Sequence, residues 1–292
     1  MKKSTRRTMM MSSLAMLLVA VLALGTATYA WFTASNKGYI SNIEFTATAA
    51  DGIQLSADGL GWTSNLDFSS FNITNTTLTP RSTNNALGSN GLFTMYGADM
   101  DANTGTFTTA VRTDGYYDIT FYIYNSGSAD VTVFLGSEST VVDGDPNHNT
   151  TAATRLGFVK WNDQVTYVEG SAEYQTDLAS LNGNNGGTYF IYEPTAHADY
   201  YAVIGAGSGL QPVDAQNTPH VIANGQTGIA SSPVTVVTQL SNTTSTLGVI
   251  QAGKVACVHL FIWIEGQDID CSNAVASGAV SINLVFEKAN AN

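Results

Sequence analysis

The sequence has few basic residues and few charged residues of any kind. Among its 292 residues, 11 are Lys or Arg and 23 are Asp or Glu, which gives a formal net charge of −12. Because affinity for nucleic-acid phosphates comes mainly from Lys and Arg, this composition excludes a nucleic-acid-binding protein. Only 12% of the residues are charged, and Gly, Thr, Ser, Asn and Ala are abundant. The composition therefore favours a neutral, polar, β-rich surface.

Catalytic patterns are also missing. The four histidines stand singly, without the HExxH spacing with which a zinc peptidase holds its metal and activates water. His259 lies in an apolar segment, and we expect it to be a packed core residue. Residues 205–209 are rich in glycine but match neither a dinucleotide-binding loop nor a phosphate-binding loop. We therefore predict that the protein is not an enzyme and needs no cofactor; the enzyme class considered and set aside is a metallopeptidase.

The sequence contains only two cysteines, Cys257 and Cys271. They would close a loop of about 15 residues, for which a disulfide contributes about 3 kcal/mol of stability by restricting the unfolded chain. We expect this disulfide to form if the protein is exported, and the alternative is a pair of free thiols. Two cysteines without a nearby CxxC partner do not make a zinc site.

The N-terminus has the pattern of an export signal. Four basic residues within the first seven positions precede an apolar stretch at 14–24, and small residues continue to Ala30. We expect residues 1–30 to be a signal helix that is cleaved before Trp31, with cleavage after Ala27 as the second choice. The alternative is an uncleaved anchor, although the apolar stretch is shorter than the roughly 20 residues that a bilayer span prefers. In both cases the protein from Trp31 onwards is secreted or lies at the cell surface. Cleavage leaves seven basic residues against 23 acidic ones, a formal charge of −16.

Residues 31–292 are expected to form a single all-β domain. Hydrophobic residues make up 44% of the sequence, which argues against disorder. Apolar and polar residues alternate, as in strands with one buried face, at 42–47, 116–123, 131–135 and 280–287. The polar turn at 125–128 makes 116–136 a predicted hairpin.

Three further segments depart from this alternation. Residues 255–264 are apolar on both faces, which predicts a central strand covered on both sides or buried by a partner subunit. Residues 171–181 have the pattern of a short helix. Residues from about 138 to 230 are rich in Gly, Asn and Thr and are expected to be a long, loop-rich insertion. The architecture favoured is an antiparallel two-sheet sandwich of jelly-roll type.

Three acidic turns are candidate calcium sites. Their side-chain oxygens recur at close spacing, as in calcium-binding loops. The same residue types also build ordinary turns, and residues 99–110 lack the glycine and the final acid of an EF-hand at the required positions. The candidate ligands are Asp99, Asp101, Asn103, Asp143, Asp145, Glu265, Asp268 and Asp270.

Residues Gly25–Thr33, which include Ala30-Trp31-Phe32, and the following Ile40–Ile43 resemble the signal-peptide junction of the TasA/camelysin family. This family consists of exported proteins of Gram-positive bacteria. Residues Cys257–Cys271 are similar to a C-terminal signature of surface proteins from anaerobic relatives of those bacteria. The resemblance implies a jelly-roll domain and assembly into extracellular matrix fibres, in which one subunit donates its N-terminal strand to the next. The peptidase activity attached to camelysin finds no matching zinc ligands here.

Two functions follow. The first is a secreted structural protein that associates with itself in a matrix fibre or cell-surface layer, because an extended segment can satisfy the unpaired backbone of a sheet edge. The expected donor is Trp31–Phe45, which in a monomer would be poorly packed or folded back on its own sheet edge. The second is an adhesin that binds a cell-surface or matrix glycan through exposed aromatic residues such as Trp62, Tyr96 and Trp161; the competing interpretation is that each is an ordinary packed residue. Membrane contact is expected only through the signal segment before cleavage.

Overall fold

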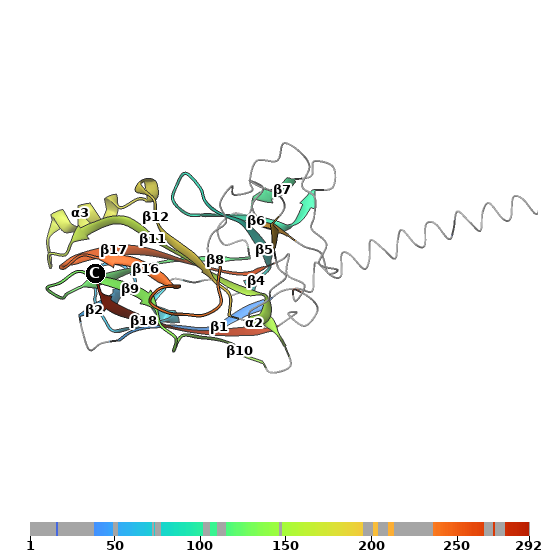
Figure 1. Cartoon of the computed structure of the whole chain (residues 1–292), viewed down its shortest axis with the longest axis horizontal. Coiled ribbons are helices and arrows are strands. Elements are labelled where there is room, and N and C mark those ends of the chain that lie inside the picture. Colours follow the sequence, from blue (N-terminus) through green and yellow to red (C-terminus); the bar gives the residue numbers. More distant parts are fainter. Residues whose placement is uncertain are drawn as a thin grey trace, which may run out of the picture.

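The computed structural model describes the chain in segments, and every structural statement below concerns these segments. They are residue 16 and residues 38–48, 52–71, 73, 77–101, 106–109, 115–145, 148–194, 201–203, 210–212, 236–265, 271 and 278–291. They form two large β-sheets that face each other across a hydrophobic core, with few and short helices (Figure 1). The expectation of an all-β sandwich of two sheets is confirmed. Apart from Met16, the expected signal segment 1–30 lies outside the described residues, as does Trp31.

Sheet A contains the first and the last strand of the described chain. Its main path runs through β16 (Thr246–Ile250), β9 (Val131–Leu135), β18 (Ala279–Asn290), β1 (Gly38–Ala47) and β3 (Asn65–Asp67). Two short strands complete it, β10 (Thr140–Asp143) beside β18 and β4 (Thr77–Leu78) beside β1.

Sheet B is the larger of the two. Its path runs through β15 (Val236–Val237), β12 (Gly187–Tyr192), β11 (Thr154–Thr166), β17 (Lys254–Glu265), β5 (Pro80–Leu87), β6 (Phe93–Asp101) and β7 (Thr106–Thr109). Strand β8 (Tyr117–Asn125) also pairs with β17, and β2 (Ile53–Ser56) pairs with β8. A separate ribbon joins β13 (Tyr201–Val203) to β14 (Leu210–Pro212).

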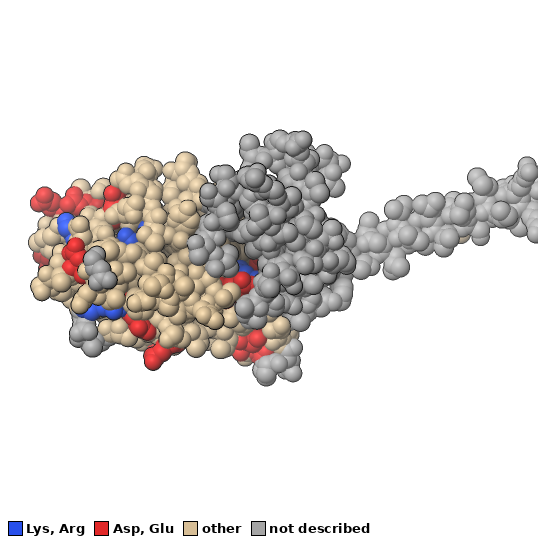
Figure 2. All heavy atoms as spheres, viewed as in Figure 1, with Lys and Arg blue, Asp and Glu red and all other residues tan. Residues whose placement is uncertain are grey.

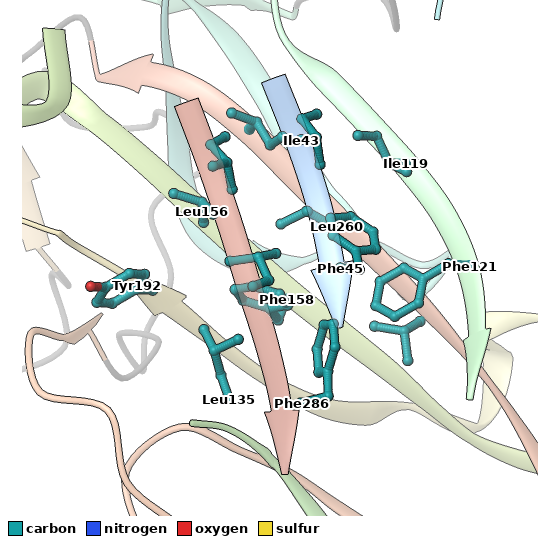
Figure 3. Close-up of a cluster of buried hydrophobic side chains, with 14 of the residues drawn as sticks. Ile43, Phe45, Ile119, Phe121, Leu135, Leu156, Phe158, Tyr192, Leu260 and Phe286 are labelled. Carbon is teal, nitrogen blue, oxygen red and sulfur yellow. The ribbon is translucent and has the colours of Figure 1, made fainter. Parts of the chain in front are cut away.

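The core consists of the side chains that alternate onto the inner faces of the two sheets. Phe45 and Phe286 from sheet A meet Phe121 from sheet B, with ring centroids 5.0 Å apart for Phe45–Phe121 and 5.3 Å apart for Phe121–Phe286 (Figure 3). All three side chains are inaccessible to solvent. Burying a side chain of this kind contributes about 1.5–3 kcal/mol, so these contacts fix which faces of the two sheets meet.

The central strand predicted at 255–264 is confirmed. Strand β17 pairs with β11 on one side and with β8 on the other, and its residues from Val255 to Glu265 are all buried. Its even-numbered residues belong to the main core, whereas Phe261 and Trp263 join a second apolar cluster on the opposite face of sheet B. The predicted helix at 171–181 is confirmed as α3 (Ala172–Ser180), whose first turn is capped by the Ser171 hydroxyl, which accepts from the Tyr174 N–H.

Three shorter helices complete the fold. They are α2 (Thr150–Ala153) and the 3₁₀ turns η2 (Phe68–Ser70) and η3 (Gly183–Asn185). Helix α2 is wholly buried, and it follows β10 at the end of the sandwich where β1 begins.

The predicted hairpin at 116–136 is wrong. Strand β8 belongs to sheet B and β9 belongs to sheet A, so the chain crosses between the sheets at this turn. The crossing is held by Asn125, which is fully buried and whose amide Nδ2 donates to the carbonyls of Ala129 and Ile250. Two alternating strands joined by a polar turn look the same in sequence whether they pair with each other or with different sheets.

The purely antiparallel arrangement is also wrong, because β1–β18, β5–β17 and β12–β15 pair in parallel. The range 138–230, expected as a loop-rich insertion, contains β10, β11 and β12 of the two sheets. Strand β11 is 13 residues long, and alternation of apolar and polar residues does not predict it, because the charged residues Arg155 and Lys160 are buried in it. Gly157 is required there by packing, since a Cβ atom at this position would lie 2.8 Å from the Phe93 ring.

Candidate functional site

The first strand of the fold, β1, lies inside sheet A, between β18 on one side and the short strands β3 and β4 on the other. We call this position the lane of β1. Strand β1 pairs in parallel with β18 from Tyr39 to Ala47, and β3 and β4 pair with its other side. Ile43 and Phe45 are inaccessible to solvent. The expectation that Trp31–Phe45 is poorly packed in a monomer is therefore wrong for residues 38–45. The alternative, that it folds back on its own sheet edge, is wrong at 38–39 and 44–45, where β4 and β3 cover the other side of β1. Residues 31–37 lie outside the described residues.

Side chains on both flanks fix the register of β1. The Ser41 hydroxyl donates to the Val280 carbonyl at 3.0 Å, and just beyond the strand the Thr48 hydroxyl donates to the Phe286 carbonyl at 3.3 Å. On the other flank the Asn65 amide donates to the Glu44 carboxylate at 2.6 Å. Strand β1 is therefore held in a single register, because a slip by one residue would turn the buried Phe45 side chain to the outer face of the sheet.

The predicted disulfide between Cys257 and Cys271 is not formed. Cys257 lies on the face of β17 that carries Phe261 and Trp263, whereas Cys271 belongs to the core between the sheets. Both thiols are buried, on opposite sides of sheet B. Burial, and secondarily the charge of Asp118, raises the pKa of Cys257 to about 12, so this thiol is a poor nucleophile.

His259 lies beside Cys257 on the same face of β17. Its Nδ1–H donates to the Asp118 carboxylate at 2.7 Å, its ring lies 4.7 Å from the Trp161 ring between centroids, and 5% of the residue is exposed. Its Nε2 atom is buried and has no hydrogen-bond partner among the described residues. The packed role expected for His259 agrees with this geometry. Its partner Asp118 was not identified, because on sequence Asp118 is simply a polar residue of an alternating strand.

A buried ionic group lies at the end of sheet B. Arg155 in β11 donates through Nη2 to the Glu193 carboxylate at 2.9 Å and through Nη1 to the carbonyls of Ala152 and Thr154. Nearby, Glu265 is inaccessible to solvent and accepts from the Trp263 indole N–H at 3.0 Å. The ion pair ties β11 to the end of β12, and the Trp263–Glu265 bond lies within β17. In the sequence, the only indication of this buried ionic group is that charged residues occur within apolar segments.

The candidate calcium ligands are engaged in other contacts where the structure describes them. Asp143 accepts from the Thr151 backbone N–H at 2.8 Å, and the Asp145 carboxylate lies 3.1 Å from His148 Nδ1. Asp99 and Asp101 lie in β6 with side chains outside the described set. Asn103, Asp268 and Asp270 lie outside the described residues altogether. Over the described part of the chain, no three His, Cys, Asp or Glu residues are grouped so that they could hold a metal ion.

Two of the three candidate glycan-binding aromatic residues are packed. Trp62 lies against Tyr124 and Tyr167, with ring centroids 5.2 and 5.6 Å away. Trp161 lies against His259, and its indole N–H donates to the Gly91 carbonyl. The Tyr96 side chain is outside the described set. Most of the described surface in Figure 2 is neutral, with few and scattered charged side chains, as the composition predicts.

Lys160 is a buried cation that sequence analysis missed. Only 3% of it is exposed, and its Nζ donates to the carbonyls of Trp161 and Val249 at 3.2 and 3.4 Å. Gln164 donates to the same Val249 carbonyl at 2.9 Å. These contacts join β11 of sheet B to β16 of sheet A and close that side of the sandwich. Burial lowers the pKa of the Lys160 ammonium group.

The described helices include none that is long and apolar enough to cross a bilayer. A scan against protein-family models and searches of curated proteins and of solved structures return no match to this chain.

Proposed function

We propose that the protein is a secreted structural subunit of an extracellular matrix fibre or cell-surface layer, in which subunits join by exchanging their N-terminal strands. The observation that carries the proposal is the position of β1. The strand that follows the export-type junction fills an internal lane between β18 and the short strands β3 and β4. The jelly-roll type of sandwich, the signal helix 1–30 and cleavage before Trp31 belong to the same proposal.

The place of β1 in the chain makes exchange physically simple. As the first strand after the signal segment, β1 can leave its lane without any other strand having to unthread. A neighbouring subunit supplies an identical β1, which restores the pairing with β18 and the burial of Ile43 and Phe45. Exchange of identical elements therefore links subunits at little cost in contacts, and head-to-tail exchange that does not close gives a filament.

A reversible lock on β1 tests this proposal. Thr46 and Asn65 face each other between β1 and β3, next to the bond from the Ala47 N–H to the Ser64 carbonyl. They therefore form a non-hydrogen-bonded pair, with Cα atoms about 4.5 Å apart, which suits a disulfide. In the double variant Thr46→Cys/Asn65→Cys, oxidation should hold β1 in its own lane.

We expect negative-stain microscopy to show filaments of the mature wild-type protein and of the reduced double variant. The oxidised double variant should remain monomeric, and Thr46→Cys alone should assemble normally under both conditions. Assembly of the oxidised double variant at the wild-type rate would show that β1 is not exchanged. If the mature wild-type protein forms no filaments at any concentration or pH, the structural role gives way to the glycan-binding adhesin.

A further inference from the structure

Strand β10 forms an open margin of sheet A. Strands β9 and β10 both pair with the same side of β18, and they are separated by a bulge in which the Ser139 hydroxyl accepts from the Val285 N–H. Strand β16 covers the far side of β9 only, because it begins at Thr246, opposite Phe134. Among the described residues, no strand pairs with the far side of β10, which lies at the lower margin of the view in Figure 1.

The direction of the free backbone groups of β10 follows from its register. The Gly144 N–H donates to the Ala279 carbonyl, one step beyond the pair Asp143–Val280. Since hydrogen-bonded and non-hydrogen-bonded pairs alternate in antiparallel strands, Val142 also bonds β18 through its backbone. Val141 and Asp143 therefore direct their N–H and C=O groups away from β18.

Two other margins of the sandwich are closed by contacts of a kind that no described residue makes with the outward backbone groups of β10. The Val249 carbonyl of β16 is occupied by Lys160 and Gln164. At β2, Leu55 exchanges two backbone bonds with Thr63, at 2.7 and 2.9 Å. Strand β10 has the sequence Thr-Val-Val-Asp, rich in β-branched residues, and contains neither the Lys nor the Pro that commonly protects an edge.

We propose that β10 is a self-association edge, at which the β10 strands of two copies pair antiparallel about a two-fold axis at Val142. This inference rests on the proposed structural function and adds a side-to-side contact between subunits. In this register Val141 of each copy faces Asp143 of the other, so the outward backbone groups meet and each pair exchanges two hydrogen bonds. A second copy fits the edge because the pattern is complementary to itself, and no two acidic side chains are placed opposite each other.

The side chains support the same register. Val141 points into the core and is 8% exposed, whereas Val142 points to the outer face of sheet A and is 50% exposed. Pairing places the two Val142 side chains opposite each other and covers both. An edge of four residues buries much less than the roughly 1,200 Å² of a stable interface, so pairing is weak between free subunits and effective where many subunits are aligned. Because the chain is acidic, higher salt should strengthen it.

Cysteine cross-linking of the mature protein tests this register. In the variant Val142→Cys, the introduced cysteines of two paired copies form a non-hydrogen-bonded pair. Their Cα atoms are about 4.5 Å apart, within the range of a disulfide. Val168→Cys is the matched control, since Val168 is 51% exposed and lies outside the strands. The native cysteines are only 1% and 4% exposed. Under mild oxidation we expect Val142→Cys to form reducible dimers at least about 10-fold faster than the control, because pairing raises the local concentration of the thiols.

A charge variant gives an independent measurement. Val142→Lys places two ammonium groups opposite each other, so sedimentation velocity should show less self-association than for the wild type or Val168→Lys. Equal cross-linking of the two cysteine variants, or unchanged association of Val142→Lys, overturns the proposal. Absence of the Val142→Cys dimer also overturns it, and this is the result expected if residues 31–37 of another copy occupy the edge instead. Filaments without this cross-link would refute β10 pairing alone. The cross-linked dimer without filaments would support β10 pairing and refute the proposed fibre function.

Discussion

Arg155 and Glu193 form an ion pair with an N–O distance of 2.9 Å, and their side chains are only 2% and 5% exposed. The pair joins the start of β11 to the residue that follows β12, on the side of β11 away from β17. In so little water, the pairing lowers the cost of burying both charges, because an isolated buried charge is far more costly than a buried pair.

Removing one member of this pair should destabilise the protein strongly. We expect Glu193→Ala to lower the free energy of unfolding by about 3–5 kcal/mol, since the Arg155 guanidinium then stays buried without its carboxylate. Glu193→Gln, which keeps an oxygen acceptor, should cost less. Urea unfolding followed by tryptophan fluorescence measures both. A loss below about 1 kcal/mol for Glu193→Ala would mean that Arg155 gains water or another partner.

The cysteines give a second prediction. In urea without reductant, both Cys257 and Cys271 should be alkylated, because they form no disulfide. In the native protein near neutral pH, Cys257 should react slowly, since burial raises its pKa to about 12. Peptide mapping by mass spectrometry gives the modified fraction at each site. Protection of both residues in urea, relieved by a reductant, would restore the disulfide that the sequence predicted.

The parts of the fold that could be predicted are those where one segment carries its own signal. The run of apolar residues on both faces of 255–264 identified a central strand, and the pattern at 171–181 identified α3. Pairing partners could not be predicted in this way. Strands β8 and β9 are adjacent in the chain yet lie in different sheets, and the buried Asn125 amide that holds the crossing looks like an ordinary turn residue.

The contacts of the site residues depended on long-range geometry for the same reason. The spacing of Cys257 and Cys271 allowed a disulfide, but the parity of Cys257 in β17 turns its thiol away from the core that holds Cys271. Strand β11 was missed because Arg155 and Lys160 interrupt its apolar pattern, and each is compatible with burial only through partners distant in sequence, Glu193 and the Val249 carbonyl. Composition, by contrast, predicted the neutral surface without any knowledge of pairing.

Lys160 should make stability depend on alkaline pH. Its pKa is lowered from 10.5 by burial, so the unfolded chain binds this proton more tightly than the folded protein. Stability therefore rises with pH between the lowered pKa and 10.5, relative to a variant without the amine. We expect the free energy of unfolding of the wild type minus that of Lys160→Met to increase over this interval. The control is Lys254→Met, because the ammonium group of Lys254 makes only an exposed hydrogen bond, to the Thr166 hydroxyl.

Urea unfolding at a series of pH values measures this difference. A flat difference across the interval would mean that the Lys160 ammonium group reaches water through local motion. A decrease with pH would mean that its contacts with the Trp161 and Val249 carbonyls favour the protonated form more than burial disfavours it.

Tyr117 should act in the opposite direction at high pH. Burial raises its pKa from 10.0 to about 12, so the stability that its neutral form contributes is complete below pH 10 and is lost as pH rises towards 12. Its hydroxyl is buried without a hydrogen-bond partner among the described residues. Tyr117→Phe should thus be at least as stable as the wild type near neutral pH and more stable between pH 10 and 12. Alkaline unfolding monitored by circular dichroism tests this, and a less stable Tyr117→Phe near neutral pH would reveal a bond to the hydroxyl.

Deletion of Trp31–Lys37 separates folding from assembly. In the described part of the chain, strand β1 begins at Gly38 and pairs with β18, β3 and β4 through residues 38–47. We therefore expect the truncated mature protein to remain folded and soluble, with a melting temperature close to that of the full mature chain. Filaments should be lost, because the deletion removes the N-terminal part of the segment that we propose is donated to the next subunit.

A variant with residues 31–37 replaced by Gly and Ser distinguishes the loss of side chains from the loss of length. If the deleted form polymerises as well as the intact mature protein, donation does not involve these residues, and any exchange must be confined to β1 itself, where the Thr46→Cys/Asn65→Cys lock detects it.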